Sequence, residues 1–116
     1  MNLQSQVLNA INRERMKAGV KALVERPDIT GSADLRAKES ATAWSHTRPD
    51  GSPFYTANNM IYGENLAKDF RTAEEIVAAW MKSDIHRKVM LDARYQGASV
   101  GVYDNGKMYV SLELTL

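Results

Sequence analysis

Two histidines and one glutamate are the residues of this chain best suited to chemistry. His46 and His86 are its only histidines among 116 residues, and each lies beside a stretch that breaks helices rather than inside an apolar stripe. Glu64 directly follows Gly63, where glycine lets the backbone turn. A single histidine or glutamate is more often a solvated or structural residue than a functional one. The three therefore predict a site only if the fold brings them together.

Three kinds of site would use this set of side chains. Two neutral imidazoles and a carboxylate are a known zinc-binding combination, with water completing the tetrahedron. A serine beside a histidine that a carboxylate orients is the arrangement of serine hydrolases, and Ser83 lies three residues before His86. Ser83 is also placed to cap a short helix, which is the commoner role for a serine at such a position. The other candidate, Ser45, is too near His46 along the chain for a favourable hydrogen bond to its ring. The third kind of site is a cleft that binds a ligand without chemistry.

Composition narrows the range of partners. The net charge is +1, with basic and acidic residues interspersed, so nothing indicates a nucleic-acid partner or a polybasic membrane patch. The absence of cysteine rules out disulfides and thiolate zinc sites without indicating a compartment. No apolar run approaches the length of a membrane span, and the N-terminal stretch lacks the layout of a signal peptide. We expect one soluble domain over residues 1–116, although the chain could also be the mature part of a longer precursor.

Apolar residues at helical spacing predict three amphipathic helices and a short fourth one. The predicted ranges are about 3–18, 29–44, 72–83 and 84–91. Thr72 and Glu75 stand in capping-box register, and Ser83 or Asp84 would cap the last helix. The helical register also predicts that Trp44 and the tryptophan of the third helix belong to the core.

Turns and strands account for much of the remaining chain. The stretch Arg-Pro-Asp-Gly at residues 48–51 predicts a bend that Pro49 and Gly51 shape and that Arg48 and Asp50 tie down. Residues 98–103 and 107–114 are rich in valine, tyrosine and leucine, and Asp-Asn-Gly-Lys between them indicates a hairpin. We expect residues 56–70 to be irregular, with a short extended piece.

Several of these stretches resemble motifs of the CAP superfamily, which comprises cysteine-rich secretory proteins, antigen 5 and pathogenesis-related 1 proteins. The similar stretches are SHTRPDG (45–51), GENLA (63–67), AWMKSDIHRKVML (79–91) and SVGVY (99–103). The first two predicted helices, with LNAINRERMKAG and ADLRAKESATAW, are also similar. Nearly the whole chain is covered in the family's order, and the likeness is nearest to its compact, cysteine-free bacterial branch.

The resemblance implies an α+β fold, an α-β-α sandwich with a small antiparallel or mixed sheet between helical layers. It also implies a ligand cleft containing His46, Glu64 and His86, with Ser83 and Tyr62 as further candidates and zinc, if any metal, on the two histidines. Tyr62 could line that cleft or pack beneath it. Relatives commonly carry a second cleft glutamate where this chain has Ser83, so we expect weak to moderate zinc binding and no mechanism that needs two carboxylates.

The resemblance favours a binding function over a catalytic one. Members of the family have been linked to sterols, fatty acids, peptides and partner proteins, with no shared reaction, and a fold does not determine a function. We therefore expect a secreted or cell-surface binding module whose ligand is an unidentified small molecule, lipid, peptide or protein. The alternative is a metal-dependent or Ser/His/Glu hydrolase acting on peptides.

Overall fold

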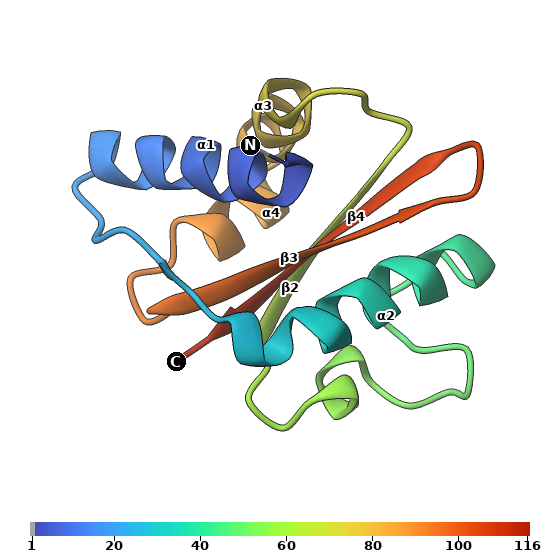
Figure 1. The fold of residues 1–116 in the computed structure, drawn as a ribbon. Helices are drawn as coiled ribbons and strands as arrows, with labels where there is room; N and C mark the ends of the chain where they lie inside the picture. Colours follow the sequence, from blue (N-terminus) through green and yellow to red (C-terminus); the bar gives the residue numbers. More distant parts are fainter. Residues whose placement is uncertain (1) are drawn as a thin grey trace.

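The computed structural model describes residues 2–116, and its elements follow the predicted order (Figure 1). They are α1 (Leu3–Lys17), β1 (Val24–Glu25), η1 (Pro27–Ile29), α2 (Thr30–Thr42), η2 (Phe54–Ala57), β2 (Gly63–Lys68), α3 (Ala73–Lys82), α4 (Asp84–Met90), β3 (Gly97–Asp104) and β4 (Met108–Thr115). Within residues 2–116, no helix is both long enough and apolar enough to cross a membrane.

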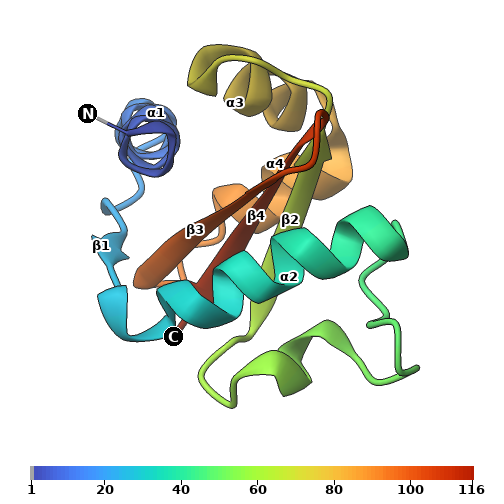
Figure 2. The same cartoon turned by 45° about the vertical axis from the view of Figure 1, so that its right-hand side comes forward.

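A sheet of four strands lies between the helices. Over residues 2–116 its strand order is β1-β3-β4-β2, with β1 parallel to β3 and the other two pairs antiparallel. Figure 2 shows α2 against one face of the sheet, with α1 and α3 on the other side. The predicted α+β class and the α-β-α sandwich with a mixed sheet are therefore confirmed.

The two faces of the sheet differ in chemistry. The face toward α1 and α3 is apolar, and its side chains form one core with the buried stripes of these helices. That core includes Val7, Ile11, Ile76, Val77, Trp80, Val100, Val110, Leu112 and Leu114. The face toward α2 carries buried polar residues instead, among them Glu64, Ser99, Ser111 and Glu113. Burying an isolated polar group is costly, so this polar face needs partners on α2.

The two tryptophans have different environments. Trp80 is buried as predicted, with its Nε1 donating a hydrogen bond to the Leu66 carbonyl at 3.0 Å. The prediction that Trp44 belongs to the core is wrong, because α2 ends at Thr42 and the chain becomes extended at Ala43. Trp44 is 47% exposed, with Lys68 Nζ 4.5 Å from its ring centre.

The bend at residues 48–51 is built as predicted. Gly51 has φ +89°, a conformation that favours glycine, and its amide donates to the Arg48 carbonyl at 2.8 Å. Asp50 accepts from the Ser52 amide at 2.9 Å, and Arg48 donates to both carboxylate oxygens of Glu39 on α2. The bend is therefore fixed to the helix that precedes it.

Residues 56–70 contain the short extended piece that was expected, and it is a strand of the sheet. Residues Gly63–Lys68 form β2, which pairs along its length with β4. The strand lacks a polar–apolar alternation because residues 63–67 are all buried. Since alternation is the main sequence sign of a strand, β2 was not recognisable as one.

Candidate functional site

A buried ion pair between α2 and β2 is the foundation of the site. Arg36 Nε and Nη2 each donate to a different oxygen of the Glu64 carboxylate, both at 2.8 Å. Both side chains are fully buried. Paired guanidinium and carboxylate groups in this bidentate geometry form strong, directional hydrogen bonds. Burial favours the neutral acid, but the hydrogen bonds from His46 and Arg36 outweigh it and hold the pKa of Glu64 below its usual range.

Glu64 in turn orients His46. The ring Nδ1 of His46 lies 2.8 Å from Glu64 Oε1, the oxygen that also accepts from Arg36 Nη2. An ionised carboxylate can only accept, so the Nδ1 of His46 carries a proton, and in the neutral ring Nε2 is the nitrogen left with a lone pair. His46 reaches this position just beyond α2, with half of its side chain exposed. The predicted pairing of a histidine after the second helix with the glutamate of the Gly-Glu-Asn stretch is thus present in the structure.

His86 enters from α4 with a serine as its partner. Its Nδ1 lies 2.8 Å from Ser83 Oγ, and the ring is partly buried. Burial first, and then the nearby charge of His46, lower the pKa of His86, so its imidazole stays neutral around pH 7. Asn65 of β2 donates to the His86 carbonyl at 3.0 Å, which ties α4 to the sheet beside Glu64.

The hydroxyl of Ser83 does not cap α4, although Ser83 stands at the start of this helix. Ser83 is the N-cap residue of α4, but its side chain makes no capping hydrogen bond, so the predicted capping role is wrong. The hydroxyl bonds to the His86 ring instead. The other candidate serine, Ser45, accepts from the Thr47 amide at 2.9 Å through its hydroxyl.

One cavity of about 300 Å³ brings the predicted residues together. His46, Glu64 and His86 all line it, although they come from three separate segments. Tyr62 also lines the cavity with 57% of its surface exposed, so it does not pack beneath the cleft. Ser83 touches the cleft only through its bond to His86. The remaining walls are largely apolar and include Phe54, Ile85, Val89 and Tyr95. We call this cavity the histidine cleft.

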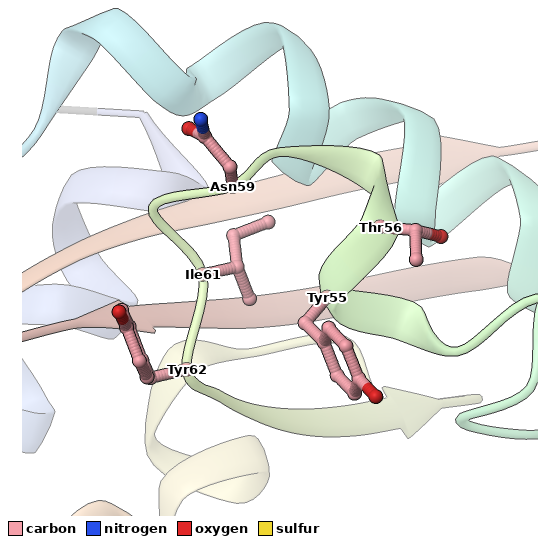
Figure 3. A pocket seen from close by; sticks show the side chains of 5 residues that line it. All are labelled: Tyr55, Thr56, Asn59, Ile61 and Tyr62. Carbon is pink, nitrogen blue, oxygen red and sulfur yellow. The ribbon is translucent and has the colours of Figure 1, made fainter.

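A second cavity of about 540 Å³ lies beside the histidine cleft. Tyr55, Thr56, Asn59, Ile61 and Tyr62 line it, all from the loop between α2 and β2 (Figure 3). Tyr62 lines both cavities. A row of edge-to-face ring contacts also connects the two cavities. The ring of Phe54 contacts His46, which lines the histidine cleft, and Tyr55, which lines the second cavity. We call this second space the tyrosine cavity.

Two charged residues of the site were not predicted. Arg36 and Glu113 are both fully buried, and Glu113 lies directly opposite Glu64 on the neighbouring strand β4. Within residues 2–116, neither oxygen of Glu113 has a hydrogen-bond partner. Burial, and then the interaction with the neighbouring Glu64 carboxylate, raise the pKa of Glu113 well above its usual range. The Arg36 guanidinium is already bonded to Glu64, so Glu113 is expected to be a neutral acid at pH 7.

Glu113→Gln should therefore remove a pH dependence of stability. A carboxyl group whose pKa is higher in the folded state binds more protons there, so its contribution to stability is complete only below the unfolded pKa and falls as pH rises. As the pH rises above about 5, wild type should lose up to about 1.4 kcal/mol per pH unit relative to Glu113→Gln, until Glu113 ionises in the folded protein. Urea unfolding of both proteins across this range measures the difference. A constant difference would show that Glu113 is ionised in the folded protein.

Comparison with known protein sequences agrees with the resemblance. The model of the cysteine-rich secretory protein family, CAP, matches residues 8–113. Over 116 aligned positions the chain is 34% identical to the uncharacterized protein YkwD of Bacillus subtilis (strain 168), covering 91% of this chain and 44% of that protein. The chain thus spans less than half the length of this relative.

Solved structures share the fold. An extracellular protein containing an SCP domain from Bacillus anthracis has a TM-score of 0.77 at 20% identity, covering 97% of this chain and 40% of that one. An outer surface protein from Borrelia burgdorferi has a TM-score of 0.75 at 18% identity, covering 99% of this chain and 96% of that one. At such identities the likeness concerns the fold alone. Together with the family match over residues 8–113, it places the chain in the CAP superfamily, in its cysteine-free bacterial branch.

Proposed function

We propose that this domain is a secreted or cell-surface binding module whose ligand contacts the two imidazoles of the histidine cleft. One observation supports this most strongly: both rings use Nδ1 for a partner inside the protein. Among residues 2–116, neither Nε2 has a hydrogen-bond partner, and both rings line the same cavity. The extracellular and outer-surface fold relatives from Bacillus anthracis and Borrelia burgdorferi support the proposed location.

Zinc is the ion that we propose for this cleft, bound by two imidazoles and water. No group of three histidine, aspartate or glutamate side chains within residues 2–116 is arranged to hold a metal. Glu64 does not serve as a third ligand, because its oxygens already accept from Arg36 and His46. A carboxylate behind a metal-binding histidine is common in zinc sites, where it orients the ring and raises its basicity. His46 and His86 would thus hold the ion, with Glu64 and Ser83 as their supports.

We expect zinc to bind with one site per chain and more weakly than in structural sites, which use four protein ligands. The affinity should fall as pH decreases, because protonated imidazole cannot bind a metal. Calorimetry at neutral pH tests this. The double variant His46→Ala, His86→Ala should give no binding heat, while Ser83→Ala should weaken binding about tenfold through loss of its support to His86. Equal heats for wild type and the double variant would refute zinc binding at this site.

A hydrolase remains the second candidate because Ser83 lies within hydrogen-bond distance of His86. The two functions require opposite tautomers. As a base, the His86 Nδ1 would accept from Ser83, whereas zinc on Nε2 requires Nδ1 to donate. The carboxylate is bonded to His46 rather than to His86, so the serine–histidine pair lacks the group that orients a base. We expect no appreciable peptidase turnover; turnover that Ser83→Ala abolishes would favour the hydrolase.

A further inference from the structure

The histidine cleft contains an unpaired edge of the sheet. β2 is the outer strand in the order β1-β3-β4-β2, so only its β4 side is paired. The amide of Asp69 donates to the Met108 carbonyl at 3.0 Å, and this bond continues the β2–β4 register. Backbone groups in a strand point alternately to opposite sides. The odd-numbered residues of β2 therefore bond to β4, and the even-numbered ones direct their N–H and C=O groups away from it. Tyr62, just before the strand, breaks this alternation, because its amide donates to the Leu114 carbonyl of β4 at 2.8 Å.

Glu64 is the residue of β2 that lines the cleft with its backbone groups directed away from β4, and 5% of its surface is exposed there. At the next outward position, the Leu66 carbonyl already accepts from Trp80 Nε1 at 3.0 Å, which agrees with the alternation. For Glu64, the β2–β4 register turns the backbone N–H and C=O away from β4, and within residues 2–116 no loop or helix backbone group bonds to them. Its neighbours Gly63 and Asn65 line the cleft with it. An unpaired donor and acceptor on one strand residue are the groups to which an extended peptide binds when it adds to a sheet.

The tyrosine cavity provides room for a side chain of such a peptide. Tyr62 precedes Glu64 by two residues and lines both cavities. At about 540 Å³, with walls from Tyr55 and Ile61, the cavity is large enough for an aromatic or branched aliphatic group. Thr56 and Asn59 make part of its wall polar. This mixed wall, contributed by one short loop, suits a compact side group better than a long hydrocarbon chain.

We propose that the ligand of the histidine cleft is an extended peptide that pairs with the backbone of Glu64 and places a bulky apolar side chain in the tyrosine cavity. The inference rests on the proposed binding function and specifies the class of ligand. The backbone of Glu64 supplies sequence-independent affinity, and the cavity supplies preference for one side chain. The two imidazoles lie beside the paired residue, where His46 Nε2 accepts a hydrogen bond from a donor on the peptide.

The experiment uses zinc-free protein labelled with ¹⁵N and a blocked peptide, acetyl-Gly-Ala-Phe-Ala-Gly-amide. Titration should shift the backbone amides of Glu64, Ile61 and Tyr62 most, and amide exchange of Glu64 should slow on binding. Replacing phenylalanine by alanine, or methylating the backbone nitrogens of the peptide, should each weaken binding roughly tenfold or more. In the protein, Tyr62→Ala should have a similar effect, while Tyr103→Ala, at a tyrosine that lines neither cavity, should have none.

Several results would overturn the inference. A peptide that leaves the Glu64 amide unchanged, or a methylated peptide that binds as well as the parent, would contradict strand addition. Shifts around Tyr62 caused by decanoate but not by the peptide would assign the cavity to lipid. Failure of the underlying binding function is distinguishable, because it appears as a double histidine variant that still gives the full heat of zinc binding.

Discussion

Arg36→Met is expected to destabilise the protein by about 3–5 kcal/mol, the cost of leaving a buried charge without its partner. Methionine keeps the apolar stem of the side chain and removes the guanidinium group, so the loss includes its charge and all of its hydrogen bonds. Arg36 donates to both Glu64 oxygens, to Glu39 at 3.1 Å and to the Ser45 carbonyl at 2.9 Å. Without it, Glu64 would be buried beside Glu113 with only His46 as a partner. Urea unfolding at pH 7 measures the change.

Two further variants separate the buried pair from a general effect of losing an arginine. Arg94→Met removes an exposed bidentate partner of Asp92 and should leave the unfolding midpoint unchanged. The double variant Arg36→Met, Glu64→Gln should be more stable than the sum of the single losses predicts, because the uncompensated charge is gone. An Arg36→Met protein as stable as wild type would show that the ion pair contributes nothing net to folding.

Gly101→Ala should be similarly damaging, for a steric reason. Gly101 lies on β3 where α2 crosses the sheet, and a Cβ atom there would overlap the backbone of Ala33 and Asp34. Backbone cannot move aside as a flexible side chain can, so α2 would have to shift away from the sheet. We expect a loss at or above the upper end of the roughly 1–3 kcal/mol typical of overpacking. Because α2 also carries Arg36, the shift should weaken zinc binding at His46 as well.

Gly31→Ala is the matched control for the glycine substitution. Gly31 is in α2, and nothing lies within 4 Å of a Cβ built there. Alanine is favoured over glycine in a helix, so this variant should be as stable as wild type or more stable by up to about 1 kcal/mol. Thermal unfolding of both alanine variants gives the comparison. Equal melting temperatures for them would show that close contact of α2 with β3 is not required.

The sequence predicted the cleft residues better than the interactions that hold them. His46, Glu64 and His86 were found because they stand in motifs that resemble a known family. Arg36 had a recognisable sign that was not used: it shares one helical face with Ala33 and Ala37, which are core positions. An arginine on such a face must be paired inside the protein, so it indicates a buried acid elsewhere.

Glu113 could not have been found from the local pattern. It alternates with Leu112 and Leu114, and a charged residue in alternation normally lies on a solvated face. Here β4 is a central strand covered by α2 on one side and by the apolar core on the other, so both faces are buried. Strand order depends on contacts between distant segments and is not visible in the strand itself. The strand β2 was predicted only as a short extended piece for another reason: residues 63–67 are all buried and show no alternation.

The central claim is that His46 and His86 present their Nε2 atoms to one shared ligand. Long-range ¹H–¹⁵N correlation spectra of the two rings, recorded with and without zinc, test it most directly. The account predicts a protonated Nδ1 on His46 in both states, because Glu64 accepts that proton, and a zinc-induced shift at Nε2 of both histidines in the same titration. A response at Nδ1, or at one ring only, would contradict a shared site built on these two atoms.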